Sequence, residues 1–481
     1  MAQAPLDTIT TNIPARLDRL PWARWHWRVL IGLGTVWILD GLEVTIVGNI
    51  TTRLSESGSG IDITDAQASG TAAALYVLGA CVGALAFGYL TDRWGRKRLF
   101  MITLGLYLLA TALTGLSTEA WMFYLFRFLT GAGIGGEYSA INSAVDELIP
   151  ARYRGRIDII INGTYWLGAV GGALLSIVAL DTSLLPIDLG WRVTFGIGVV
   201  LGLVILLVRR HVPESPRWMF IHGHAAAAEE LAGRIEDRVR RETGRDLAEP
   251  DGEITIHQRR SIGFGEIART MVRAYPKRSI LGFSLFIGQA FLYNAITFGY
   301  ATILATFFNV PSGRTGYFYA TLAAGNFIGP LLLSPLFDLW GRRPMVSGTY
   351  LLSGALLFAT ALLFNAGVLT AVTLTLCWCV ALFFASAGTS SAYLTVSEVF
   401  PMEVRAMAIA FFYAIGTAAG GISGPLFFAK MVGTGNPLDT SIAFAVGAVL
   451  MMAAGTVAVF LGVDAERKSL EDVASPLSQR D

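Results

Sequence analysis

The chain of 481 residues has few cysteines and few charged residues. Its three cysteines, Cys81, Cys377 and Cys379, all lie in apolar segments, so the sequence contains neither a disulfide framework nor the spacing of a zinc site. Charged residues make up 15% of the chain, well below the share typical of a soluble protein. The net charge of +1 gives no sign of a nucleic-acid partner, and none is expected. The scarcity of charge indicates a chain that is solvated by lipid.

Long apolar runs fill most of the sequence, which is 54% hydrophobic with a mean hydropathy of +0.57. A membrane-spanning helix needs about 20 apolar residues. Twelve segments are predicted to span: 27–50, 66–90, 98–118, 121–147, 157–180, 191–209, 278–308, 315–337, 345–364, 368–396, 405–430 and 438–463. Residues 1–20 are polar and lack the short apolar core of a secretory signal, so the first span is expected to direct insertion.

Lysine and arginine concentrate in alternate loops. The loops after the second, fourth, eighth and tenth spans hold Arg93, Arg96, Lys97, Arg98, Arg152, Arg154, Arg156, Arg342, Arg343 and Arg405. The opposite loops hold only Arg53, Arg192, Arg314 and Lys430. Because basic loops stay on the cytoplasmic side, both termini are expected to be cytoplasmic in a multi-pass protein of the cell inner membrane.

A polar stretch over residues 210–276 divides the spans into two sets of six. The expected domains are an N-terminal six-helix bundle (1–209), a cytoplasmic central loop (210–276), a C-terminal six-helix bundle (277–464) and a cytoplasmic tail (465–481). Ala225 to Arg240 has the apolar spacing of an amphipathic helix. The histidines of this loop, His211, His222 and His224, are expected to be solvated, and no metal site is expected.

Two short signatures occur twice, about 250 residues apart. The first is Asp92-Arg93-Trp94-Gly95-Arg96-Lys97, echoed by Asp338-Leu339-Trp340-Gly341-Arg342-Arg343. The second is Glu147-Leu148-Ile149-Pro150 with Arg154, echoed by Glu398-Val399-Phe400-Pro401 with Arg405. The repetition indicates a duplicated membrane protein. Duplication with polar residues at mid-span favours a carrier that moves two halves around one site.

Charged residues inside the first-half spans are the strongest functional signal, because each is costly at mid-membrane. Asp40 and Glu43 share one face of the first span, and the fourth span holds Arg127 and Glu137. Two acids facing one base leave an acid unpaired, which suits proton coupling better than a purely structural link. The alternative is a buried ion pair that only locks helices together.

Uncharged polar residues mark the second half instead. The predicted solute contacts are Gln289, Tyr293, Asn294, Thr297, Tyr300, Asn326 and Tyr393, together with Asn162 and Trp166 of the fifth span. The alternative for these groups is hydrogen bonding between helices. Asn294 falls about 140° from Gln289 on an ideal helix, so the seventh span is expected to bend or unwind near Tyr293 if both face the cavity.

Small residues recur every fourth position in the fourth span, at Gly131, Gly135 and Ser139. Such spacing lets helix backbones approach closely. The fourth span is therefore expected to pack tightly against a neighbour.

Several segments together resemble the major facilitator superfamily over nearly the whole chain. They are Gly88 to Lys97 after the second span, Arg127 to Gly133 in the fourth, Pro213-Glu214-Ser215-Pro216-Arg217-Trp218 after the sixth and Ser397 to Pro401 after the tenth. Within the superfamily the chain is similar to sugar porters. Asp40-Gly41-Leu42-Glu43 looks more like the aromatic-acid symporters, and Gly135-Gly136-Glu137 like the metabolite symporters.

The resemblance implies an all-α fold of twelve transmembrane helices in two pseudosymmetric six-helix bundles, working by alternating access. It implies a cytoplasmic clamp built from Asp92, Arg93, Arg96, Glu147, Arg154, Asp338, Arg342, Glu398 and Arg405. It also places Glu43 where sugar porters bind a proton, with Arg127 as its partner, and Gln289 and Asn294 at sugar-contacting positions.

The sequence thus predicts a secondary transporter that couples protons to the symport of a small organic solute, such as a sugar or an organic acid. The proton is the coupling ion, no other cofactor is expected, and a monomer is expected to suffice. No phosphate-binding loop and no catalytic cluster is visible, so neither ATP-driven transport nor an enzyme is expected. The alternatives are a proton-coupled exporter of organic ions or drugs, and a transport-inactive sensor or scaffold on the same fold. The sequence leaves open whether Asp40 or Glu43 carries the proton.

Overall fold

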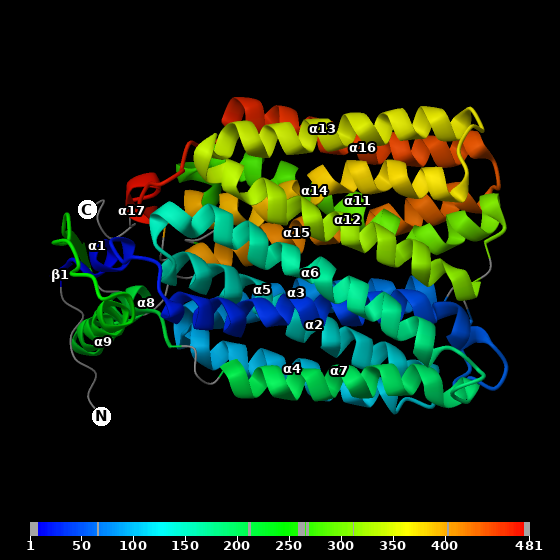
Figure 1. The fold of residues 1–481 in the computed structure, drawn as a ribbon, viewed down its shortest axis with the longest axis horizontal. Coiled ribbons are helices and arrows are strands. Elements are labelled where there is room, and N and C mark those ends of the chain that lie inside the picture. Colours follow the sequence, from blue (N-terminus) through cyan, green and yellow to red (C-terminus); the bar gives the residue numbers. More distant parts are fainter. Residues whose placement is uncertain are drawn as a thin grey trace.

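Long helices make up almost all of the computed structural model (Figure 1). It describes residues 8–64, 67–209, 213–257, 265, 269–310, 312–401 and 404–475. The twelve long helices are α2 (Arg24–Ser55), α3 (Ala72–Trp94), α4 (Arg96–Gly115), α5 (Ala120–Leu148), α6 (Ala151–Ala179), α7 (Ile187–Arg209), α11 (Pro276–Phe308), α12 (Ser312–Leu339), α13 (Arg342–Asn365), α14 (Ala371–Val399), α15 (Arg405–Gly433) and α16 (Pro437–Leu461).

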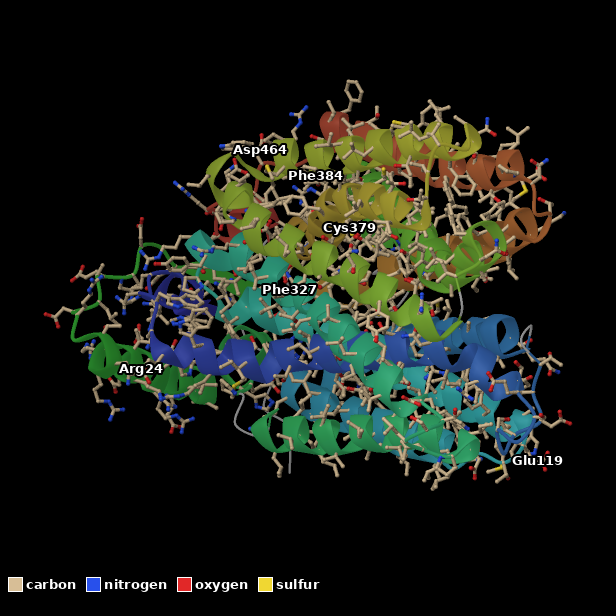
Figure 2. All side chains as sticks on the ribbon, turned by 45° about the vertical axis from the view of Figure 1, so that its right-hand side comes forward. Arg24, Glu119, Phe327, Cys379, Phe384 and Asp464 are labelled. Carbon is tan, nitrogen blue, oxygen red and sulfur yellow. The ribbon has the colours of Figure 1, made fainter. Side chains whose placement is uncertain are left out.

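Eleven of these helices in the described parts of the chain are long and apolar enough to cross a membrane. The remaining one, α5, carries four charged residues, Arg127, Glu137, Asp146 and Glu147, which lower its hydropathy. These side chains are buried against other helices and do not face lipid. Figure 2 shows Arg24 and Glu119 at opposite ends of the molecule, with mostly carbon side chains on the faces between them. The twelve helices therefore span the membrane together.

Helices α2–α7 form one bundle and α11–α16 the other, which occupy the lower and upper halves of Figure 1. Close glycine contacts hold each bundle together. A Cβ atom added at Gly131 or Gly135 of α5 would lie 2.1 or 2.0 Å from a backbone oxygen of α3. A Cβ at Gly329 of α12 would lie 2.0 Å from the Phe383 oxygen of α14. The predicted small-residue face of the fourth span is therefore a packing face.

The two bundles meet along two seams. Helix α6 packs against α12, and α3 packs against α15. At the first seam, a Cβ on Gly163 would lie 2.5 Å from Pro330, so only glycine allows this approach. Each seam joins one helix from either half of the duplication, and the space between the seams holds the candidate site.

Both described chain ends lie at one end of the molecule, where short elements form a basal layer (Figure 1). This layer consists of α1 (Ile13–Asp18), α8 (Pro216–Ile221), α9 (Ala225–Thr243), α17 (Leu470–Val473) and the antiparallel strands β1 (Thr8–Thr11) and β2 (Ile254–His257). Two single helical turns cover Gln67–Thr71 and Thr270–Ala274. Helix α9 is amphipathic, with Ala228, Ala232, Ile235 and Val239 buried.

Candidate functional site

A cavity of about 160 Å³ lies between the bundles. Its aromatic lining residues are Trp37, Tyr76, Tyr138, Tyr165, Trp166, Tyr293, Tyr393 and Tyr413. Its polar lining residues are Asn162, Gln289, Asn294, Thr297, Ser386, Thr389, Ser390 and Thr417. Both bundles contribute to each group, so a bound solute would contact both moving parts of the protein.

Seven of the nine predicted solute contacts line this cavity: Asn162, Trp166, Gln289, Tyr293, Asn294, Thr297 and Tyr393. Asn326 lies one step behind it, where its Oδ1 accepts a hydrogen bond of 3.0 Å from the Tyr293 hydroxyl. Tyr300 lies elsewhere. Its hydroxyl shares a 2.6 Å hydrogen bond with Thr375, and its ring packs on Trp378 inside the second bundle. In this structure Tyr300 links helices α11 and α14 and does not reach the cavity.

The unwinding expected near Tyr293 as one alternative is not seen in this conformation. Helix α11 runs unbroken from Pro276 to Phe308, yet Gln289 and Asn294 both line the cavity. The intermediate directions are filled by Ala290, Tyr293 and Thr297, which line it as well. The cavity therefore faces a wide arc of a continuous helix, and no local unwinding is needed to place both amides in it.

Aromatic rings form the walls of the cavity, and the sequence prediction missed most of them. Trp37 and Tyr138 stack in parallel with centroids 4.4 Å apart, and Tyr413 meets Tyr138 edge to face at 5.0 Å. Trp166 and Tyr293 approach to 5.2 Å across the two bundles. Helical spacing offered a signal for Trp37, which lies one turn before Asp40.

The buried charges lie close to the cavity but behind its wall. Arg127 pairs with Glu43, and both side chains are 2% exposed. Asp40 accepts a hydrogen bond of 3.2 Å from the Tyr76 hydroxyl and another from that of Tyr138. Neither Asp40, Glu43 nor Arg127 lines the cavity, whereas both tyrosines do. The tyrosines therefore separate the solute space from the charged cluster.

The fourth predicted coupling residue, Glu137, is also buried. Thr103 of α4 donates a hydrogen bond of 3.5 Å to Glu137 Oε1. The structure thus brings together Asp40, Glu43 and Arg127, and Glu137 accepts this hydrogen bond from helix α4. Gly41 helps to position the acids, because any Cβ there would lie 1.8 Å from the Tyr165 oxygen of α6. Close approach of α2 and α6 depends on this glycine.

The first copy of the duplicated signature forms a compact buried cluster. Gly95 turns the chain between α3 and α4 with φ of 94°, a conformation that favours glycine. Arg96 donates to Glu147 at 2.8 Å. Glu214 accepts from the backbone nitrogens of Arg96 and Lys97 at 3.0 and 3.2 Å. A carboxylate at this helix N-terminus satisfies unpaired donors and the helix dipole. Burial raises the pKa of Glu214 above its usual range.

The second copy repeats this arrangement. Gly341 has φ of 104°, and Arg342 donates to Glu398 at 2.9 and 3.0 Å. Glu466 accepts from the Arg342 backbone nitrogen at 3.3 Å, as Glu214 does in the first copy. Arg342 also pairs with Asp338 at 2.8 Å. The repeated residues thus hold equivalent structural positions in the two bundles.

Further bonds join the two bundles at the basal end. The Arg156 backbone nitrogen donates to Asp338 at 3.0 Å, and Arg405 lies 3.8 Å from Glu147. Arg154 reaches the Lys468 carbonyl at 3.4 Å. Arg93 is exposed, and the side chain of Asp92 lies outside the described part of the chain. These bonds close the basal end of the seam in this conformation.

The opposite end is less tightly closed. A second hollow of about 120 Å³ lies between α3, α11 and α15, lined among others by Ala73, Thr302 and Pro425. Val77 lines both this hollow and the central cavity. The second hollow therefore lies between the central cavity and the membrane face opposite the basal layer.

The basal layer also ties the chain ends together. Arg217 pairs with Asp18 at 3.0 Å and with Glu471 at 2.8 Å.

The expected solvation of His222 is only partly met, because its ring stacks on Trp218 with centroids 4.4 Å apart. Burial lowers its pKa to about 4, so His222 is uncharged at neutral pH. The structure holds no group of three metal-ligating side chains among its described residues.

Two bundles of six membrane-spanning helices around a central cavity define a carrier of the major facilitator type. A model of the family described as "Sugar (and other) transporter" matches residues 36–475, and the chain belongs to this family. The niacin transporter NiaP of Acinetobacter baylyi is 25% identical over 96% of this chain and 99% of its own. A probable 4-methylmuconolactone transporter of Cupriavidus pinatubonensis is 26% identical over 86% of this chain and 88% of its own. The solved proton:xylose symporter XylE bound to 6-bromo-6-deoxy-D-glucose matches with a TM-score of 0.75 at 17% identity, covering 94% of this chain and 98% of its own.

Proposed function

We propose that the protein carries a small organic metabolite across the cell inner membrane together with protons, with both termini in the cytoplasm. The observation that carries this proposal is the Glu43–Arg127 ion pair, buried inside the membrane next to a solute-sized cavity. The family match and the proton:xylose symporter with the same fold support it. On this assignment the basal layer is cytoplasmic and the second hollow lies on the outer side of the central cavity.

The coupling follows from the cost of burying an unpaired charge. Protonation of Glu43 removes the charge that pairs with Arg127, whose guanidinium would then stay buried beside the Tyr76 ring. A buried charge without a partner is disfavoured by several kcal/mol. The protonated protein therefore favours a conformation in which Arg127 finds other partners. A solute that binds one protonation state more tightly couples its own flux to that of the proton.

Proton coupling can be tested in vesicles that contain the purified protein. Uptake of a radiolabelled panel, with xylose, nicotinate, nicotinamide and benzamide, is measured with and without an inward proton gradient. Glu43→Gln should retain exchange of an accepted solute but lose gradient-driven accumulation. Glu119→Gln, which changes an exposed acid in a loop, is the matched control and should behave like the wild type.

Two other outcomes would replace this proposal. Solute movement out of the vesicles in exchange for protons moving in, without uptake of solute together with protons, would identify an exporter. Binding of a panel member without any flux would identify a transport-inactive sensor. Normal accumulation by Glu43→Gln would move the coupling role to Asp40 or Glu137, or remove proton coupling.

A further inference from the structure

Asp146 and Asp158 are two buried acids that the proposed coupling cycle does not use. Asp146 lies near the end of α5 and Asp158 near the start of α6, both close to the basal layer, and each side chain is fully buried. Both carboxyl oxygens of Asp146 and Oδ2 of Asp158 lack a hydrogen-bond partner in the described parts of the chain. A buried carboxylate without partners is costly, so these two groups require an explanation.

The two acids lie next to each other on facing helices. Helix α6 follows α5 after a short turn, and Asn162 Nδ2 of α6 donates to Asn142 Oδ1 of α5 at 3.0 Å. One turn nearer the basal end the same faces carry Asp146 and Asp158, because residues four apart share a helix face. Asp146 is accordingly the charged group that acts most strongly on Asp158, and its effect is repulsive. Two carboxyl groups in one buried space cannot both be ionised at low cost.

The bases near this pair already have other partners. The charged groups that face the pair from α5, α6, α12, α13, α14 and α15 are Glu147, Arg154, Asp338, Arg342, Glu398 and Arg405. The ion pairs of the three arginines are with other acids: Arg154 with Asp18 at 3.2 Å, Arg342 with Glu398 at 2.9 Å and Arg405 with Glu147 at 3.8 Å. No described base forms an ion pair with either aspartate, so full ionisation would leave two buried negative charges without a partner.

The internal duplication shows that the fold does not need these acids. The offset between the two copies of the second signature pairs Asp146 with Ser397 and Asp158 with Ile409. In both copies the arginine of the signature donates from Nε to the backbone carbonyl of the first of these positions, at 3.2 Å in the first half and 2.7 Å in the second. The backbone contact is thus kept while the side chains differ. The two carboxyl groups are an addition found in the first half alone.

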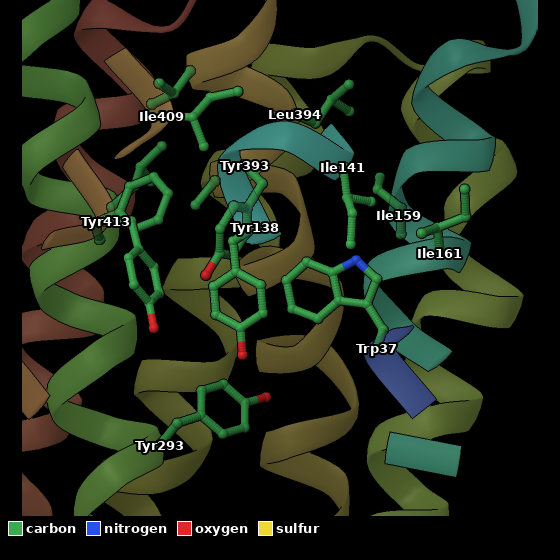
Figure 3. Packing of buried hydrophobic residues seen from close by; sticks show 14 of the residues in the cluster. Trp37, Tyr138, Ile141, Ile159, Ile161, Tyr293, Tyr393, Leu394, Ile409 and Tyr413 are labelled. Carbon is green, nitrogen blue, oxygen red and sulfur yellow. The ribbon is translucent and has the colours of Figure 1, made fainter. Parts of the chain in front are cut away.

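An apolar layer separates the pair from the central cavity. Figure 3 shows Ile141, Ile159, Leu394 and Ile409 together on one side of the Tyr138 ring. Each of the four is fully buried and lies nearer the basal end of its helix than the cavity-lining residues of that helix do. The shortest way for water to reach the two acids is therefore from the basal end, when that end opens.

We propose that Asp146 and Asp158 form a second proton-binding site, which holds a shared proton while the basal end is closed and releases it when that end opens. Opening admits water, which favours the anion just as burial favours the neutral acid. The carboxyl O–H bond then breaks, and a water molecule on the basal side takes the proton. This inference rests on the proposed transport function and adds a point of proton release to it.

Opening and proton release favour each other. The ionised carboxylates would repel one another at the closed seam, so loss of the proton favours the open state by the same free energy by which opening favours loss of the proton. Asn162 lies between this site and the cavity. Its side chain lines the cavity, and its Nδ2 donates to Asp158 Oδ1 at 3.3 Å. The solute space therefore contacts the second site through this residue.

Labelling of a cavity cysteine from the basal side measures how often the basal end opens. Ser390→Cys places one thiol in the cavity, in a background without the three native cysteines. Membrane vesicles with the basal face outward are treated with a membrane-impermeant maleimide at the same pH on both sides. Between pH 5.5 and pH 8, labelling of the protein with both aspartates should rise at least about fivefold more than labelling of an Asp146→Asn/Asp158→Asn double variant, which cannot ionise. Because the same thiol is labelled in both proteins, its own ionisation cancels in the ratio of the rates.

Asp237→Asn is the matched control. It changes an exposed acid of α9 in the basal layer, so it should show the full rise with pH. Each single variant, Asp146→Asn or Asp158→Asn, should reduce the rise. Thermal unfolding shows whether the double variant is folded, and the single variants provide the test if it is not.

An equal rise with pH in the presence and absence of the two aspartates would overturn the inference. Loss of the rise in Glu43→Gln but not in the double variant would also overturn it, because pH sensing would then belong to Glu43. These outcomes are separate from those of the coupling test, since no proton gradient is applied. Loss of accumulation in Glu43→Gln with an unchanged rise in the double variant would remove the second site and leave proton coupling standing. A rise that depends on the two aspartates, in a protein that accumulates no solute, would do the reverse.

Discussion

The ring of Tyr76 lies 4.4 Å from the guanidinium carbon of Arg127, a cation–π contact inside the membrane. The hydroxyl of the same residue donates to Asp40, and its side chain lines the central cavity. Tyr76 therefore contacts the buried base, a buried acid and the solute space at once. A solute that displaces this ring would alter both charged groups.

The Tyr76→Phe variant tests this connection. It keeps the ring under Arg127 and removes one of the two hydrogen bonds to Asp40. Loss of one such bond is worth about 1 kcal/mol or somewhat more. We expect proton-driven uptake to fall several-fold while the protein remains folded. Tyr317→Phe, on an exposed side chain, should leave uptake unchanged. Equal uptake by both variants would show that Tyr76 only fills space.

The buried ion pairs at the basal end should hold the present conformation. Glu147→Gln removes the charge that pairs with Arg96 and lies near Arg405 of the other bundle. Loss of one partner of a buried pair is strongly unfavourable, so the basal end should open more often. A cysteine introduced by Ser390→Cys in the cavity, in a background without native cysteines, should then react faster with a thiol reagent applied from the basal side. Unchanged reactivity would contradict the clamp.

A prediction from pKa concerns the basal layer. Burial alone would raise the pKa of Glu236, but hydrogen bonds from Arg16 and Arg19 outweigh it and hold the pKa below the ordinary value of 4.5. A carboxyl with a lowered pKa stabilises the folded state above that ordinary value, and the stabilisation is lost as the pH falls through the folded pKa. The difference in melting temperature between wild type and Glu236→Gln should therefore be present at pH 6 and shrink below pH 4. A difference that does not change with pH would contradict this assignment.

The contact between α2 and α6 should tolerate no added side chain at Gly41. A Cβ atom added at Gly41 would lie 1.8 Å from the backbone oxygen of Tyr165. The helix backbone cannot move aside as the end of a flexible side chain could. We expect Gly41→Ala to destabilise the protein by about 2 kcal/mol or more. Gly48→Ala on the same helix meets nothing within 4 Å and is the control. The melting temperatures of the two variants in detergent provide the measurement.

The fold was predictable because its signals are local. Hydropathy identified the spans, and α5 was recognised despite its four charges because its remaining residues are apolar. The duplicated signatures placed Arg96 and Arg342 in equivalent loops, and the structure adds the capping acids Glu214 and Glu466 that lie far away in sequence. The roles assigned to the clamp and coupling residues remain predictions.

The walls of the cavity were harder to predict, because the direction a side chain faces depends on neighbouring helices. Tyr300 lies on the same face of α11 as Tyr293, seven residues further along. Its side chain nevertheless packs against α14 inside its own bundle. Trp37 is marked only by its place one turn before Asp40, and Tyr413 stands out in no sequence pattern, although both line the cavity. The structure shows no unwinding of α11 for a related reason: the width of the arc that faces a cavity is a property of the assembled bundle.

The unbroken course of α11 has a mechanical consequence. A continuous helix of 33 residues is roughly 50 Å long at 1.5 Å per residue. It has no break at the depth of the cavity in this conformation. We therefore expect movement between the two halves to occur at the seams, where α6 packs on α12 and α3 on α15. At the first of these seams Gly163 packs closely against Pro330. A larger side chain at Gly163 would therefore be expected to hinder rotation of one bundle relative to the other.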